Sequence, residues 1–249
     1  MCGVLSLLSS VTQDLRAQPE VGQPRFELRV PAGTGRFPVV ALVPGCSGFR
    51  NDRFRSRFDW YVEKLIERGF ATVRIDYLGS RGVREPCADA NTGIWEPRIS
   101  ADLEHAAKAL ATDARLDATR LFVVGWSLGG GGVLAYLSRL PHGGAAAFCR
   151  AVVYYPTCRS VRHLNGRIPT LLFLPELDNI QPVSFCDSLM SALDDKKLVS
   201  VRRFESSHHA FDLVELPVMT VAAAQATVAA NPAAAKIAWD ELLAFFDKP

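Results

Sequence analysis

The chain has 249 residues, of which 49% are hydrophobic and 22% charged, and its net charge is +2. A globular chain of this length can bury a sizeable core, and because no linker, low-complexity tract or repeat divides it, we expect one domain. Basic and acidic residues are interspersed, which argues against a nucleic-acid-binding surface. No apolar run reaches the roughly 18 residues that a membrane-spanning helix needs.

Residues 1–24 are interpreted as an N-terminal extension, followed by a single domain over residues 25–249. The segment over residues 2–8 is apolar but short, and it lacks a positively charged leader and a convincing cleavage site. It is therefore a poor signal peptide as written, although it fits the remnant of one.

Apolar periodicity predicts alternating strands and helices in the first half of the domain. The strands expected there cover residues 26–30, 37–43 and 70–77. The helices expected there cover residues 54–68 and 99–112. A glycine loop, Pro44-Gly45-Cys46-Ser47-Gly48, follows the second of these strands.

The same alternation continues in the second half. The strands expected there cover residues 120–125, 151–155, 170–174 and 199–204. The helices expected there cover residues 128–140, 183–193 and 231–246, the last beginning with the capping pair Asn231-Pro232. Alternating strands and helices indicate a mostly parallel sheet with helices on both faces, an α/β architecture whose chemistry lies at the carboxyl ends of the strands.

The most informative motif is Gly125-Trp126-Ser127-Leu128-Gly129, a G-x-S-x-G element between an expected strand and an expected helix. Its glycines leave room for a cramped turn that exposes the Ser127 hydroxyl as a nucleophile. The glycines continue through residues 129–132, which predicts either close packing of the helix against neighbouring strands or a frayed first turn.

A nucleophilic serine needs a base, and the base needs an orienting carboxylate. In chains with this elbow the acid and then the histidine follow the serine. Asp178 and His209 lie in loops after two successive expected strands, so we expect them at the same sheet edge as Ser127. Glu176 is the alternative acid and His208 the alternative base. Asp178 has a further interpretation, as a cap for the helix after it.

Five segments of the chain share one resemblance. They are Pro44–Gly48, Asp76–Val83 with Cys87 after it, Gly125–Gly130, Glu176–Asn179 with Pro182 after it, and His209–Phe211. Together they resemble the dienelactone hydrolase family, which implies the α/β-hydrolase fold from about residue 37 to the terminal helix. Dienelactone-opening members carry a cysteine at the elbow and a glutamate in the first glycine loop, whereas this chain has Ser127 and no such glutamate. The resemblance thus implies a serine-nucleophile branch and a general carboxylic ester hydrolase.

The expected chemistry is acyl transfer through an acyl-enzyme. His209 takes the proton of Ser127, Asp178 holds the imidazole, and the backbone N–H groups of Cys46 and Leu128 form the oxyanion hole. The substrate is expected to be a small-molecule ester or lactone, with no metal and no organic cofactor. An acyltransferase or perhydrolase with the same triad, a dienelactone-type lactone hydrolase, a peptidase and a fold-only binding protein are the alternatives.

Two further side chains are candidates for substrate contact, each with a structural alternative. Trp126 either packs under the elbow or touches substrate. Arg81 either holds a substrate carboxylate or forms a salt bridge that stiffens its loop.

The chain has six cysteines. Cys46 with Cys87, and Cys158 with Cys186, are plausible disulfides because each pair falls in loops or elements near one edge, while Cys149 is interpreted as a buried free thiol. Disulfides favour a periplasmic or secreted protein over a cytoplasmic one. The oligomeric state is left open.

Overall fold

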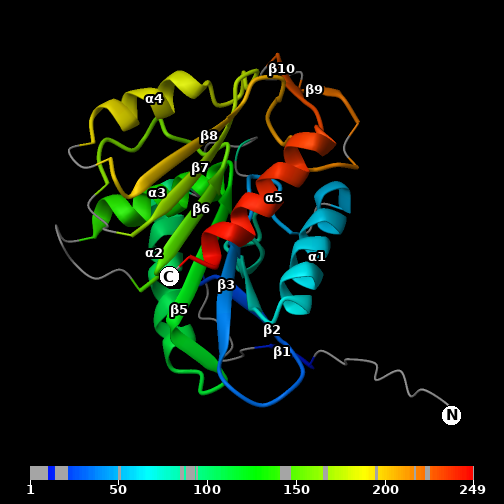
Figure 1. The fold of residues 1–249 in the computed structure, drawn as a ribbon, viewed down its shortest axis with the longest axis vertical. Helices are drawn as coiled ribbons and strands as arrows, with labels where there is room; N and C mark the ends of the chain where they lie inside the picture. The colour runs from blue at the N-terminus through cyan, green and yellow to red at the C-terminus, as the bar shows by residue number, and fades with distance from the viewer. Residues whose placement is uncertain are drawn as a thin grey trace, which may run out of the picture.

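A central sheet of eight strands organises the molecule, in the order β1-β2-β4-β3-β5-β6-β7-β8 (Figure 1). The strands are β1 (Val11–Asp14), β2 (Arg25–Val30), β3 (Phe37–Val43), β4 (Ala71–Asp76), β5 (Leu116–Trp126), β6 (Arg150–Tyr154), β7 (Thr170–Pro175) and β8 (Val199–Phe204). β1 and β2 pair antiparallel to their neighbours, and every pair from β4 to β8 is parallel. This computed structural model describes residues 11–14, 22–49, 52–84, 87, 93, 95–140, 147–164, 168–193, 196–215, 217–221 and 225–248.

Helices cover both faces of the sheet, as Figure 1 shows. The helical segments are α1 (Asp52–Glu67), the 3₁₀ turn η1 (Gly79–Arg81), α2 (Glu96–Ala111), α3 (Leu128–Arg139), α4 (Val183–Ser191) and α5 (Pro232–Phe246). Side chains of α2, α3 and α4 share one core with the sheet, and those of α1 and α5 share the other. The predicted mostly parallel sheet with helices on both faces is therefore confirmed.

The two cores follow from the alternation of side chains along each strand. In β3, Val39, Ala41 and Val43 belong to the α2–α3 core, whereas Val40 and Leu42 belong to the α1–α5 core. Because successive residues of a strand point to opposite faces, a strand buried on both faces reads as one continuous apolar run. This is why β3 was recognisable from sequence.

The predicted elements all occur, with ends that differ by a few residues. Three short strands were not predicted: β1, β9 (Met219–Val221) and β10 (Ala226–Val228). The last two form a separate antiparallel pair, and β1 lies inside the segment interpreted as an N-terminal extension, where it adds an edge strand next to β2. Strands of three or four residues contain too few positions for an alternating pattern to stand out.

Both predicted disulfides are present. Cys46 is joined to Cys87, with their Cα atoms 5.7 Å apart, and Cys158 is joined to Cys186, with their Cα atoms 5.0 Å apart. Cys149 is free and half-buried, and burial raises the pKa of its thiol. Cys2 lies outside the described residues.

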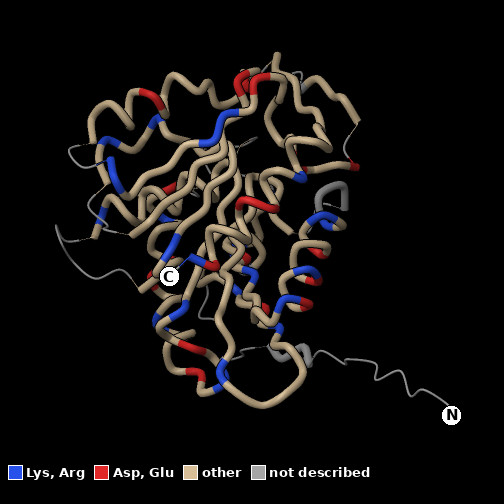
Figure 2. Tube along the Cα trace, in the orientation of Figure 1, with Lys and Arg blue, Asp and Glu red and all other residues tan. Residues whose placement is uncertain are grey.

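Charged side chains of both signs are distributed over the described elements, and Figure 2 shows acidic and basic residues alternating along α1. The strands at the centre of the sheet are largely uncharged in the same view. None of the helices that the structure describes is long and apolar enough to cross a bilayer.

Candidate active site

The chain turns sharply at Ser127, between β5 and α3. Ser127 has φ +50° and ψ −118°, a positive-φ conformation that costs a non-glycine residue about 1–3 kcal/mol. Its backbone is held on both sides, because its N–H donates to the Tyr154 carbonyl at 2.9 Å and its carbonyl accepts from Gly131 N–H at 2.9 Å. A strained serine at the carboxyl end of a central strand is the geometry expected of a nucleophile elbow.

The glycines of the motif are required by close backbone packing. A Cβ on Gly125 would lie 2.8 Å from Gly130 Cα, and one on Gly129 would lie 2.3 Å from the Pro44 carbonyl oxygen. A Cβ on Gly132 would lie 2.3 Å from Ile99 Cγ2 in α2. These contacts fit the close-packing interpretation of the glycine run, and they bring the Pro44 loop against the elbow.

Gly129→Ala is expected to destabilise the protein by about 1–3 kcal/mol or more, because the new methyl group meets backbone that cannot swing away. Gly130→Ala is the matched control in the same helical turn. Its Cβ would lie 3.0 Å from Pro156 Cβ and 3.1 Å from the Gly125 carbonyl oxygen, contacts that call for a shift of only a few tenths of an ångström, compared with the overlap at Gly129. Urea unfolding of both variants measures the difference, and equal free energies of unfolding would contradict the packing argument.

Ser127, His209 and Asp178 meet in one hydrogen-bonded chain. His209 Nε2 lies 3.0 Å from Ser127 Oγ, and His209 Nδ1 lies 2.7 Å from Asp178 Oδ2. In the neutral tautomer protonated at Nδ1, the imidazole donates to the carboxylate and accepts from the hydroxyl. His209 is 6% exposed and Asp178 5% exposed, so both partners of this chain are shielded from water.

The local backbone orients Asp178. Its Oδ1 accepts hydrogen bonds from the backbone N–H groups of Ile180 at 2.9 Å and Gln181 at 2.8 Å. These bonds form the turn between β7 and α4, and the N-cap position of α4 is Pro182, so Asp178 does not cap that helix. One carboxylate oxygen thus fixes the turn and leaves the other facing His209.

The His209 loop is held by elements that follow it in sequence. His209 forms an isolated parallel bridge with Val228 of β10, and its carbonyl accepts from Ala229 N–H at 3.3 Å. The Asn231 side chain donates to Ser207 Oγ at 2.9 Å and also accepts from Ala234 N–H, so the predicted cap of α5 anchors this loop as well.

The alternative acid and base point elsewhere. Glu176 is exposed and pairs with Arg203 at 3.4 Å, and the His208 Nδ1 atom lies 3.1 Å from the Leu177 carbonyl oxygen. The structure brings Asp178 and His209, and neither alternative, into the chain that ends at Ser127.

The loop after β3 lies beside the Ser127 hydroxyl. A Cβ on Gly45 would be 3.2 Å from Ser127 Cβ and 3.8 Å from Ser127 Oγ. The single proton of the buried Tyr77 hydroxyl is shared between two carbonyl oxygens, with the shorter contact to Gly45 at 2.8 Å and the longer to Pro44 at 3.0 Å. Because a trans peptide group is planar, holding the Gly45 carbonyl turns the N–H of Cys46 in the opposite direction. Leu128 is the first residue of α3. Its backbone N–H therefore has no carbonyl acceptor within the helix.

The two candidates for substrate contact occupy structural positions. Trp126 is 2% exposed and packs in the α1–α5 core, edge to face with Phe58 and Tyr61. Arg81 makes a two-pronged ion pair with the buried Asp102, at 2.7 and 2.8 Å, and also donates to the Tyr77 carbonyl. Both placements match the structural alternatives, packing under the elbow and stiffening of the loop, and not substrate contact.

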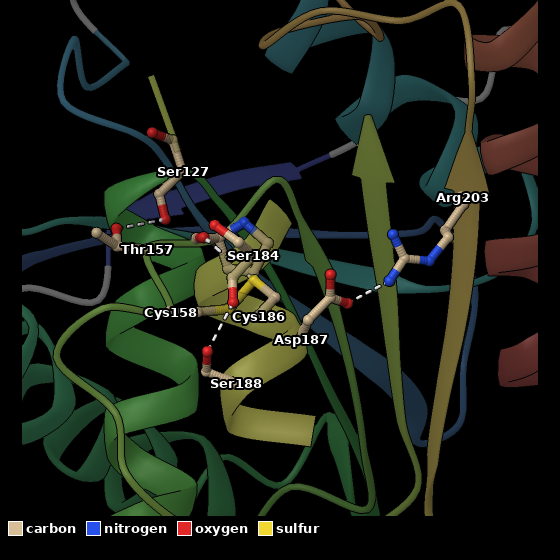
Figure 3. Close-up of a disulfide and its surroundings, with 9 residues drawn as sticks. Ser127, Thr157, Cys158, Ser184, Cys186, Asp187, Ser188 and Arg203 are labelled. Atoms are coloured by element: carbon tan, nitrogen blue, oxygen red, sulfur yellow. Dashed lines mark hydrogen bonds and ion pairs between the residues drawn. A yellow bond between two sulfur atoms is a disulfide. The ribbon is translucent and has the colours of Figure 1, made fainter. Parts of the chain in front are cut away.

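The Cys158–Cys186 disulfide lies next to the elbow (Figure 3). Thr157, adjacent to Cys158, donates from its backbone N–H and from its Oγ1 to the Ser127 carbonyl, both at 3.2 Å. The disulfide therefore ties α4 to a segment that contacts Ser127 directly.

Sequence reasoning missed two side chains next to this site, Tyr155 and Asp212. The Tyr155 ring lies against the His209 imidazole, with centroids 4.5 Å apart, and its hydroxyl donates to Asp212 Oδ1 at 2.6 Å. Asp212 comes three positions after His209 and was visible in the sequence as a polar residue after an apolar pair.

In the described part of the chain, no group of three or more His, Cys, Asp or Glu side chains is arranged to hold a metal ion.

Comparison with known proteins finds similarity to a PET hydrolase-like family and to proteins named cutinases. The family model for PET hydrolase-like proteins matches residues 27–224. A cutinase of Thermobifida alba, est1, is 30% identical over 176 residues, which cover 66% of this chain and 52% of the cutinase. Cutinase 2 of Thermobifida cellulosilytica is 28% identical over 160 residues, covering 61% of this chain and 52% of that protein. The chain thus spans about half the length of the curated relatives it matches.

Similarity of structure extends over nearly the whole chain. A crystal structure assigned as a dienelactone hydrolase of Klebsiella pneumoniae superimposes with a TM-score of 0.75 at 18% identity, covering 97% of this chain and 99% of the other. This match confirms the predicted α/β-hydrolase fold.

Proposed function

The chain belongs to the PET hydrolase-like family, and on that premise we propose that it hydrolyses carboxylic esters through a Ser127–His209–Asp178 triad and an acyl-enzyme. The observation that carries the proposal is the continuous chain of contacts from Ser127 Oγ to His209 at 3.0 Å and on to Asp178 at 2.7 Å. Hydroxyl, imidazole and carboxylate in this order are the parts that acyl transfer needs.

In the first step, His209 Nε2 removes the proton from Ser127 Oγ, which attacks the ester carbonyl carbon. The Asp178 carboxylate holds the Nδ1 proton and stabilises the imidazolium that forms. His209 then gives the proton to the departing alkoxide, so the alcohol leaves and Ser127 carries the acyl group.

The negative oxygen of the tetrahedral intermediate needs donors that are already in place. We assign this role to the backbone N–H groups of Cys46 and Leu128. The support is the position of the Gly45 loop beside Ser127 and the hydrogen bond from Tyr77 that fixes the peptide group of Cys46. In the second step His209 takes a proton from water, whose oxygen attacks the acyl carbon, and His209 then returns the proton to Ser127 Oγ as the bond to the acyl group breaks and the acid leaves.

The substrate class follows from the chemistry and from the names of the relatives. The proposed triad chemistry suits short-chain esters and lactones, and the cutinase and PET hydrolase names of the relatives extend the candidates to polyesters. The two disulfides support a location in the periplasm or outside the cell, because such bonds persist in oxidising compartments.

A panel of p-nitrophenyl esters of increasing acyl length tests the activity, with an insoluble polyester film as a further arm. We expect the purified protein to release p-nitrophenol from the short esters, and the length profile then defines the acyl preference. An added alcohol or peroxide in the same assay distinguishes transfer to water from transfer to another acceptor. Absence of turnover on every ester, with the fold intact by circular dichroism, would contradict the proposal.

A further inference from the structure

Asp212 is a wholly buried carboxylate that the mechanism above does not use. Its exposure is 0%, and it lies in the segment after His209, between the site and the α1–α5 core. A buried carboxylate is costly unless donors surround it, so its presence calls for an explanation.

Three donors converge on this carboxylate. Tyr61 Oη donates to Oδ2 at 2.9 Å, Trp126 Nε1 donates to Oδ2 at 3.0 Å, and Tyr155 Oη donates to Oδ1 at 2.6 Å. Burial is the larger cause that raises the pKa of Tyr155 well above its ordinary value, and the nearby Asp212 charge raises it further. The Tyr155 hydroxyl therefore keeps its proton and donates it to the carboxylate. The donors come from three separate parts of the chain: α1, the end of β5 and the loop after β6.

Two of these donors are next to the triad. Trp126 immediately precedes Ser127, and its indole N–H donates to the Asp212 carboxylate. The Tyr155 ring packs on the His209 imidazole, and Tyr155 has φ +38°, a strained conformation that its neighbours must maintain. Tyr61 lies on α1, which carries none of the groups assigned to the triad or to the oxyanion hole, and the packing of its ring on Trp126 does not depend on its hydroxyl.

We propose that Asp212 is a positioning residue that sets the separation of Ser127 and His209 by holding Trp126 and Tyr155 at once. One side of the carboxylate fixes the strand end that carries Ser127. The other side fixes the ring against which His209 rests. The inference rests on the proposed function, because it assigns a purpose to the geometry of that same triad.

The effect is expected in the rate and not in substrate binding, because a displacement of about 1 Å between reacting groups can cost 10²-fold in rate. Asp212→Ala removes all three acceptor contacts and should lower kcat by about 10–100-fold with KM within about twofold. Asp212→Asn should recover part of this loss. Its amide oxygen can still accept from the Trp126 indole, and its NH₂ group can donate to a Tyr155 hydroxyl that has turned to accept.

Tyr155→Phe and Tyr61→Phe form the matched pair of the experiment. Each removes one hydroxyl that donates to the same carboxylate, so a purely structural role for Asp212 predicts similar losses of Tm and similar small losses of rate. Positioning predicts that Tyr155→Phe lowers kcat by about 10-fold, whereas Tyr61→Phe keeps kcat within about twofold at a comparable loss of Tm.

The readouts are kcat and KM on a short p-nitrophenyl ester, Tm by thermal melting, and the rate at which a serine-directed phosphonate labels Ser127. Equal kcat values for Tyr155→Phe and Tyr61→Phe would overturn the inference. So would a kcat that is unchanged from wild type in both single variants, Asp212→Asn and Asp212→Ala. Where Asp212→Ala does not fold, the tyrosine pair decides alone. Absence of esterase activity in the wild-type protein would contradict the proposed function. The rates at which the phosphonate labels Ser127 in the wild type and the variants would still test whether Asp212 positions Ser127.

Discussion

Ser127→Ala is expected to lower kcat on a short p-nitrophenyl ester by at least about 10⁴-fold, because the acyl-enzyme can no longer form. The fold should persist, since alanine removes only the hydroxyl and leaves the backbone contacts of residue 127 to Tyr154 and Gly131 in place. Steady-state kinetics measure the loss, and a thermal melt shows whether the variant is folded.

Ser188→Ala is the matched control for this substitution. It also deletes one serine hydroxyl, but from the exposed Ser188 of α4, whose hydroxyl donates to the Ser184 carbonyl at 2.8 Å (Figure 3). It should leave kcat within about twofold, since it touches none of the groups that carry the chemistry. If Ser127→Ala kept more than a small fraction of the wild-type rate, the nucleophile would have to be sought elsewhere.

Asp178→Asn has the second largest expected effect, a loss of about 10⁴-fold in kcat. The amide presents an N–H or an oxygen where the carboxylate accepted the Nδ1 proton, and the charge that stabilises the imidazolium is gone. The bonds from Ile180 and Gln181 hold one oxygen of residue 178 in place, so the amide nitrogen takes the position that faces His209. That arrangement favours the wrong imidazole tautomer, with Nε2 protonated and unable to act as a base.

Glu176→Gln makes the same chemical change two positions away. Glu176 is exposed and pairs with Arg203, so we expect kcat within about twofold of wild type and a stability change within about 0.5 kcal/mol. A larger loss of kcat in Glu176→Gln than in Asp178→Asn would assign the acid to Glu176 and contradict the geometry of the site.

The sequence was most informative where one physical requirement leaves few options. The G-x-S-x-G motif is such a case, since a Cβ on Gly129 would collide with the Pro44 carbonyl and a strand must end just before Ser127. The burial of β3 on both faces is another, because its residues are apolar without interruption. The order of Ser127, Asp178 and His209 along a parallel sheet then placed their loops at one edge.

Other features depend on contacts between distant segments and left no local pattern. The β9–β10 pair is too short to show alternation, yet β10 bridges to His209. Asp212 draws its donors from residues 57 to 151 positions away in sequence, so its role emerges only when the chain is folded. Trp126 and Arg81 were weighed as substrate contacts because sequence places them near the site but says nothing of the direction of their side chains.

The most direct test of the central claim is to label the protein with a serine-directed phosphonate and map the adduct by mass spectrometry. The claim is that His209 and Asp178 make Ser127 the reactive hydroxyl of this chain. We therefore expect a single adduct on Ser127, no adduct in Ser127→Ala, and much slower labelling in His209→Ala. An adduct on another serine, or undiminished labelling of Ser127 without His209, would contradict the account.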